Sequence, residues 1–192
     1  MISITKTFPL LVAPILLSGC SLLATLEDAQ AIEEVVNDLP NYTEATADDI
    51  RPSGTASFSG HLALGDTDAE FILTDLDANV DFGASTFDGD ASQIRLIDGT
   101  AENPLQAIKE NFSGTVPWTG TITGTTVASR GSGSISASGT DYTLSFNANG
   151  DFYMNGDGKL TLASEDGVTG SLTPAGGTET SYTTGAFYAA EQ

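Results

Sequence analysis

The sequence predicts an all-β protein: an eight-stranded antiparallel up-and-down β-barrel with a soluble, polar exterior, preceded by a short N-terminal helix and tether. Three observations lead to this fold class. Apolar and polar residues alternate with a period of two from Gly54 onward, which is typical of strands with one buried face. Asn-Gly and Asp-Gly pairs separate some of these runs, as in tight hairpins. The 26 acidic residues of this 192-residue chain far outnumber its 6 Lys and Arg residues, so most carboxylates must face water.

The same composition excludes several classes of function. A net charge of −20 disfavours nucleic acids and anionic lipid surfaces, which are bound by clustered basic residues. The single Cys excludes an intrachain disulfide framework and a Cys-rich zinc site, and the single His excludes a multi-His metal site. We therefore expect no nucleic-acid partner, no metal site and no cofactor.

Residues 1–19 are predicted to be a lipoprotein signal peptide. Lys6 precedes an apolar run from Phe8 to Leu17, which is too short to span a bilayer as a helix. The run ends in Leu17-Ser18-Gly19-Cys20, which resembles the lipobox of bacterial lipoproteins. That resemblance implies that Cys20 is acylated and anchors the chain in outer-membrane lipid. Ser21, rather than Asp, follows the Cys, which by analogy favours the outer membrane, on either its surface or its periplasmic face.

Residues 20–53 are predicted to form an acidic helix and a flexible tether. Apolar residues at helical spacing predict a helix over about 25–39, ended by Pro40. These apolar residues are Leu26, Ala29, Ile32, Val36 and Leu39, and the other side carries Glu27, Asp28, Glu33, Glu34 and Asp38. Residues 40–53 contain turn formers without a period, which predicts a flexible link. The segment is either a spacer between membrane and barrel, or a helix that packs against or plugs the barrel.

The barrel domain is predicted over residues 54–192. Regular alternation predicts strands near 55–64, 75–82, 142–154 and 160–162, and weaker patterns predict strands at 86–97, 116–127, 131–138, 167–173 and 180–189. Asp98–Asn111 breaks the pattern, contains Pro104 and has room for a short helix around Leu105–Lys109. Glycines within the predicted strands suit the bending of a closed barrel, which favours a barrel over a sandwich. They are Gly60, Gly89, Gly120, Gly124 and Gly170.

Three short segments give the chain a resemblance to the transferrin-binding-protein-like β-barrel surface lipoproteins. Besides the lipobox, they are Gly54-Thr55-Ala56-Ser57-Phe58-Ser59-Gly60, Gly150-Asp151-Phe152-Tyr153 and Gly185-Ala186-Phe187-Tyr188-Ala189-Ala190-Glu191. The family motif continues with Gly-Pro where this chain has Met154-Asn155. The resemblance implies an eight-stranded barrel and, for several members, binding of host proteins through loops and a handle domain. This chain has no room for the handle or a second lobe, so transferrin binding is not carried over.

No motif in the sequence predicts catalysis, and we expect the protein not to be an enzyme. His61 lies on the polar side of the first predicted strand, and no Gly-x-Ser-x-Gly elbow accompanies it. Acid pairs of the glycosidase kind are expected by chance in so acidic a chain. Asp88-Gly89-Asp90 and Asn155-Gly156-Asp157-Gly158 offer oxygens on predicted turns, but neither matches a calcium-binding EF-hand loop. Turn formation accounts for both segments.

Trp118 is the one weak candidate for a ligand-binding residue. It follows Pro117 and is either an exposed binding aromatic or a core residue at the start of a strand. The barrel interior is either filled by side chains or open to a small apolar ligand. We expect a non-enzymatic, lipid-anchored binding module that recognises a protein or small molecule through loops or a barrel face. The alternative is a structural or envelope-accessory lipoprotein without a specific ligand.

Overall fold

The computed structural model describes residues 39–65, 69–101, 107–164 and 167–192. Within them, a 3₁₀ turn, η1 (Leu39–Asn41), precedes twelve strands. The strands are β1 (Thr43–Glu44), β2 (Thr55–Leu64), β3 (Glu70–Asp81), β4 (Thr86–Asp98), β5 (Ile108–Asn111), β6 (Val116–Thr123), β7 (Thr126–Ala137), β8 (Thr140–Met154), β9 (Leu160–Ser164), β10 (Val168–Pro174), β11 (Thr180–Tyr182) and β12 (Gly185–Glu191). The predicted all-β class is confirmed.

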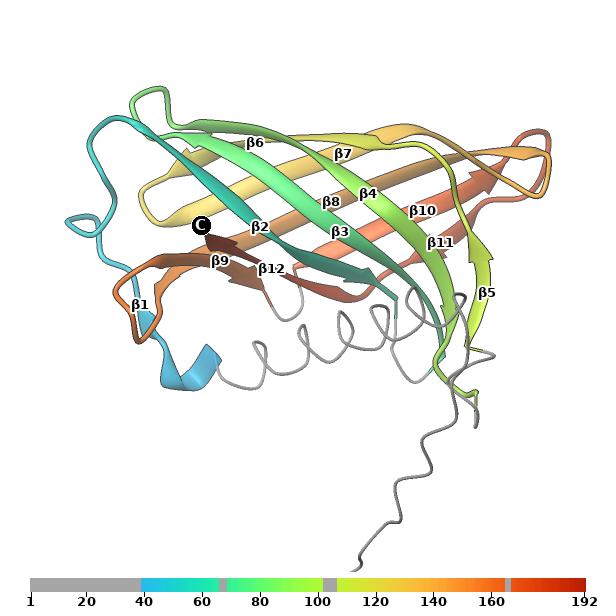
Figure 1. Cartoon of the computed structure of the whole chain (residues 1–192), viewed down its shortest axis with the longest axis horizontal. Helices are drawn as coiled ribbons and strands as arrows, with labels where there is room; N and C mark the ends of the chain where they lie inside the picture. Colours follow the sequence, from blue (N-terminus) through green and yellow to red (C-terminus); the bar gives the residue numbers. More distant parts are fainter. Residues whose placement is uncertain (1–38, 66–68, 102–106, 165–166) are drawn as a thin grey trace, which may run out of the picture.

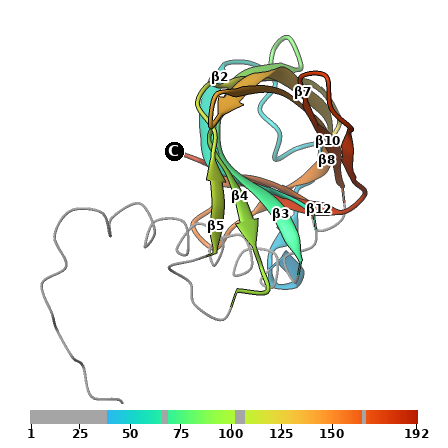
Figure 2. The same cartoon turned by 90° about the vertical axis from the view of Figure 1, so that its right-hand side faces the viewer.

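Eight of these strands close into a ring, so the barrel prediction is also confirmed. The order around the ring is β2, β3, β4, β6, β7, β8, β9 and β12, and every neighbouring pair is antiparallel. Figure 1 shows the strands from the side, and Figure 2 looks along the barrel. Strands β5 and β10 lie outside the ring and pair with ring strands. β5 pairs with β4, which also pairs with β6, and β10 pairs with β8, which also pairs with β9. The chain is thus an up-and-down meander.

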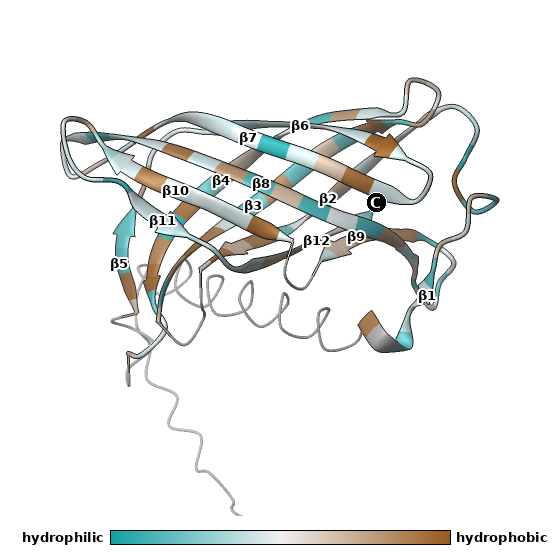
Figure 3. Cartoon of the chain, turned by 180° about the vertical axis from the view of Figure 1, so that it is seen from behind, coloured by the Kyte–Doolittle hydropathy of each residue, from teal (hydrophilic) through white to brown (hydrophobic). Residues whose placement is uncertain are grey.

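Alternation places apolar side chains inside the ring and acids outside it. In β3, Leu76, Ala78 and Val80 are at most 5 % exposed, whereas Asp77 and Asp81 are exposed. Figure 3 shows the same alternation of hydrophobic and hydrophilic positions along β7, β8 and β10. Charge determines which residues face inward, because an unpaired carboxylate inside a filled barrel would cost on the order of several kcal/mol.

Part of the predicted flexible link is attached to the barrel. β1 pairs with the end of β8, and the amide of Ala45 donates to the carbonyl of Phe152. Arg51 forms an ion pair with Glu191. Residues 43–51 therefore lie along one end of the barrel instead of forming a free tether. The predicted helix over 25–39 falls outside the described residues except for Leu39, which begins η1.

Three further expectations are corrected by the strand pairing. The predicted strand 116–127 is broken at Gly124, where a positive φ of 63° makes the turn between β6 and β7. Asp88-Gly89-Asp90 is not a turn but the middle of β4, because β3 and β6 pair with it on both sides. A helix reaching Lys109 is also wrong, since Ile108–Asn111 is strand β5. The predicted turn at Asn155–Gly158 is confirmed by the hairpin between β8 and β9.

Candidate functional site

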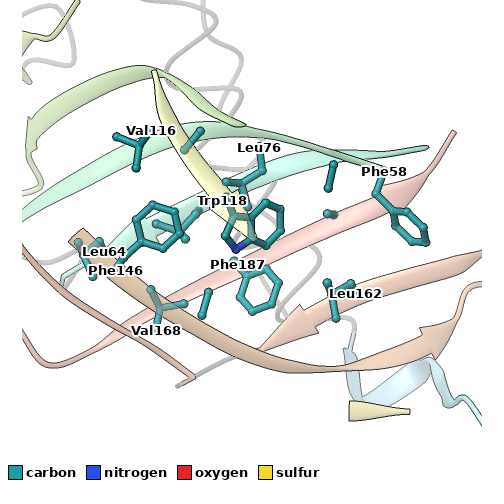
Figure 4. Close-up of a cluster of buried hydrophobic side chains, with 14 of the residues drawn as sticks. Phe58, Leu64, Leu76, Val116, Trp118, Phe146, Leu162, Val168 and Phe187 are labelled. Carbon is teal, nitrogen blue, oxygen red and sulfur yellow. The ribbon is translucent and has the colours of Figure 1, made fainter. Parts of the chain in front are cut away.

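The barrel interior is packed with large side chains, and Trp118 lies among them. Its side chain is fully buried, with its ring 4.7 Å from that of Phe87 and 6.3 Å from that of Phe187 (centroid distances; Figure 4). Phe146 packs over Gly131 from the neighbouring strand. Of the two roles left open for Trp118, the core role is the observed one. An eight-stranded barrel is just wide enough for side chains to fill it, and these aromatic side chains occupy its middle.

One side of the outer wall carries a polar cluster around Asp75. The guanidinium of Arg95 lies 2.8 Å from Asp75 Oδ1, and His61 Nδ1 lies 3.4 Å from the same oxygen. His61 faces Asp75 directly across β2 and β3, and the ring of Tyr188 on β12 meets His61 edge-on. The side chains of Arg95 and His61 are only 9 % and 18 % exposed. His61 does lie on the polar, outward side of its strand, as predicted, but its side chain is largely covered.

An apolar strip adjoins this cluster, and we call it the outer stripe. It crosses five strands on the outward-pointing positions, which the cross-strand register identifies. Its residues are Ala163 on β9, Ala186 and Tyr188 on β12, Ala63 on β2, Phe71 and Leu73 on β3, and Arg95 and Ile97 on β4. Leu73 is 0 % exposed, Ala163 1 % and Ala63 2 %. These side chains lie outside the barrel and yet are buried.

The outer stripe is the feature that the sequence analysis missed, although the sequence contains its signal. Leu62-Ala63-Leu64 and Phe71-Ile72-Leu73 are consecutive apolar residues that interrupt the period of two. Such runs are typical of strands buried on both faces. Here Leu64 and Ile72 fill the barrel while Ala63 and Leu73 belong to a separate apolar cluster outside it.

The opposite side of the outer wall, on β6, β7, β8 and β10, carries few charges: Arg130 on β7, and Asp141 and Asp151 near the two ends of β8. Between Phe112 and Thr140, Arg130 is the only charged residue. Arg130 is exposed on β7, where it is in register with Thr119 on β6 and with Asn147 on β8. A shallow groove of about 380 Å³ runs along these strands. We call this surface the neutral wall; its outward residues include Thr119, Thr121, Ala128, Arg130, Ser132, Ser145, Asn147, Asn149, Thr169 and Ser171.

The titratable groups with shifted pKa values lie on open surface or in the core. Hydrogen bonds from Thr100 lower the pKa of Asp98, and Glu70 raises the pKa of Lys109. Burial raises the pKa of Tyr182. Asp77 and Asp90 face each other across β3 and β4, and both are exposed on the sheet surface. Asp77 also lines a shallow groove of about 370 Å³ together with His61 and Asp75. Within the described ranges, no three acids, His or Cys residues cluster as a metal site.

Comparison with known proteins adds no family. No protein-family model matches the chain, and no curated protein matches it in sequence. The resemblance to transferrin-binding-protein-like lipoproteins therefore stays a prediction, beside an observed eight-stranded ring. Cys20 and the signal segment 1–19 lie outside the described residues. Among the residues that are described, no helix is long and apolar enough to cross a membrane.

Proposed function

We propose that this protein is a lipid-anchored, non-enzymatic binding module of the bacterial outer membrane, which recognises its partner through the neutral wall. Support for the anchor comes from Leu17-Ser18-Gly19-Cys20 directly after an apolar run. Support for an outer recognition surface comes from the filled interior, in which Trp118 and Phe146 occupy the space that a ligand would need. The lipid anchor places acylated Cys20 in the membrane and leaves the barrel in the aqueous phase.

The distribution of charge is the observation that selects the neutral wall. A chain with a net charge of −20 repels most acidic partners and itself. Along β6 and β7, from Val116 to Ala137, the surface carries hydroxyl groups and the single charge of Arg130. Here a partner can approach without being repelled by like charge. Hydroxyl and amide groups also hydrogen-bond in either direction, at a smaller desolvation cost than carboxylates.

The geometry of the neutral wall fits a partner with polar, uncharged groups on a flat surface. Thr119, Arg130 and Asn147 form a row across three strands, at about 4.8 Å per strand. The neighbouring row contains Ser132 and Ser145, whose hydroxyl groups are 2.9 Å apart. Arg130 supplies one charged donor at the centre, so we expect it to be the residue on which binding depends most.

An envelope-accessory protein without a ligand is the alternative, and one observation favours it. The described outer surface has hydrophilic side chains on most strands and its largest aromatic residues are inside. A polar barrel of this kind serves equally well as a solvated spacer. The two hypotheses differ in whether anything contacts the neutral wall specifically.

Site-specific photo-crosslinking in the native bacterium distinguishes them. A photoreactive amino acid replaces Thr119 or Asn147 on the neutral wall, and exposed Ser57 on the outer face of β2, across the ring from β7, as the matched control. The proposal predicts one adduct of defined mass from Thr119 and Asn147, lost with Arg130→Glu, and none from Ser57. Equal adduct patterns from all three positions, or no adducts, would favour the accessory role.

A further inference from the structure

We infer that residues 26–38 of this same chain pack on the outer stripe and cover it. In a barrel whose wall is one sheet thick, an outward side chain faces water unless something lies over it. Leu73 at 0 % and Ala63 at 2 % exposure are covered. Among the described residues, Ala107, Ile108 and the stripe's own Ala186 and Tyr188 pack against this cluster. β5 adjoins β4, at one end of the stripe, so it does not account for the burial of Ala163 at the other end.

The length of the stripe matches the length of this segment. The stripe crosses β9, β12, β2, β3 and β4, and four spacings of about 4.8 Å give about 19 Å. Thirteen residues at about 1.5 Å each give a helix of about 20 Å. The segment has apolar residues at helical spacing, Leu26, Ala29, Ile32 and Val36, and so offers one apolar face to the wall.

The segment also ends in the right place. Leu39, directly after it, is 5 % exposed and lines a groove together with Tyr153 and Ala163. Ala163 is the β9 end of the stripe and is in register with Tyr188. A chain leaving Leu39 in the N-terminal direction therefore starts at one end of the stripe. The small side chains of Ala163, Ala186 and Ala63 along its first half allow a helix to approach closely.

The charges of the segment and of the stripe favour the same direction of the segment along the stripe. The far end of the stripe, on β4, carries Arg95, one of only 6 basic residues in the chain. The first turn of the segment contains Glu27 and Asp28, which would reach this end. Arg95 already pairs with Asp75, and further acids nearby would keep it in a charged network.

One consequence concerns orientation, and it rests on the proposed lipid anchor. Leu26 is six residues after Cys20, a distance of at most about 22 Å when extended. A docked segment would hold the β4–β5 end of the stripe near the membrane. The neutral wall, on the other half of the ring (Figure 1), would then face away from it and be open to a partner.

Thiol labelling of the full chain tests the docking without depending on lipidation. Cys20→Ser removes the natural thiol, and Ala63→Cys or Ala163→Cys places a reporter in the stripe. Thr121→Cys, exposed on the neutral wall, is the matched reporter. If the segment covers the stripe, maleimide should label positions 63 and 163 at least about tenfold more slowly than position 121. Ile32→Asp with Val36→Asp should abolish this difference, whereas Glu33→Gln with Glu34→Gln should preserve it.

Three outcomes would overturn the inference. Equal labelling of positions 63, 163 and 121 in the parent chain would show that nothing covers the stripe. Protection that survives Ile32→Asp with Val36→Asp would mean that another segment or a partner is the cover. Protection that disappears on dilution would identify a second copy. Fluorescence of the buried Trp118 verifies that each variant is folded before labelling, and the two stripe reporters check each other.

Discussion

Gly60 provides the sharpest test of how closely neighbouring strands approach each other in the barrel wall. A Cβ atom placed on Gly60 would lie 2.7 Å from the Cα of Ala189 and inside contact distance of the carbonyl oxygen of Tyr188. Ordinary contacts of a Cβ begin near 3.4 Å. Because the obstacle is backbone in the paired strand β12, no rotation of a side chain can relieve it. Gly60→Ala therefore has to push β2 and β12 apart by about 1 Å.

The expected cost follows from that displacement. Overpacking in a well-packed region costs about 1–3 kcal/mol, and two weakened ladder hydrogen bonds would alone account for about 2 kcal/mol. Replacing Gly by Ala also restricts the unfolded chain, which offsets about 0.4–1 kcal/mol. We expect a net loss of about 2 kcal/mol in the free energy of unfolding. For a domain of this size the melting temperature would fall by about 4–8 °C.

Gly156→Ala is the matched control. Gly156 lies in the β8–β9 hairpin, and a Cβ there would have no neighbour within 4 Å. The same chemical change should therefore leave stability unchanged or raise it by up to about 1 kcal/mol. Urea unfolding followed by Trp118 fluorescence measures both variants, because Trp118 is the only tryptophan and is fully buried. If Gly60→Ala unfolds within about 0.5 kcal/mol of Gly156→Ala, close approach of these strands is not what requires Gly60.

Three other predictions concern charge, anchoring and pH. Asp77 and Asp90 face each other in an acidic wall, so screening by NaCl should raise the melting temperature; an unchanged melting temperature between low and moderate salt would contradict this. Cys20→Ser should abolish incorporation of labelled palmitate and release the protein from the membrane fraction, and retention of both signals would exclude the lipobox. Burial raises the pKa of Tyr182 above 10.0, helped by the negative charge of Glu70. The unfolded chain then loses this proton first, so stability falls as pH rises through 10 toward the folded pKa. Tyr182→Phe should flatten that decline in melts between pH 9 and pH 11, and an identical decline in both proteins would exclude Tyr182 as its source.

Much of the fold is predictable because one physical rule governs most of the chain. In β3, Leu76, Asp77, Ala78 and Asn79 alternate between apolar and polar, which predicts a strand. Because Asp77 must face water, the alternation also predicts that Leu76 and Ala78 face inward. The rule fails where pairing overrides local residue preference. Asp88-Gly89-Asp90 has the composition of a turn, but β3 and β6 bind it on both sides. Conversely, the chain reverses at Gly124 within a segment predicted to be one strand, and the buried positions change there from even-numbered, up to Ile122, to odd-numbered, from Val127.

The candidate surfaces were less predictable, because they depend on which strands become neighbours. Ala63 and Leu73 are ten residues apart in the chain and adjacent in the sheet, and only the sheet makes them one strip with Ala163. The neutral wall is likewise a property of the ring. β6, β7 and β8 follow one another in the chain and β10 comes after β9, but their outward polar residues form one surface only because the four strands are neighbours in the sheet.

The filled interior is the observation from which the proposed role of the outer wall is argued. Lipocalin-sized barrels bind ligands inside when small inward residues leave room. Here Gly131 and Gly120 are inward and small, but the rings of Phe146 and Phe87 occupy the space above them. Trp118 then closes the middle between Phe87 and Phe187. Opening a ligand cavity would require losing at least one of these aromatic side chains, at about 3–5 kcal/mol for a change to Ala. The proposed recognition through the neutral wall rests on this filled interior.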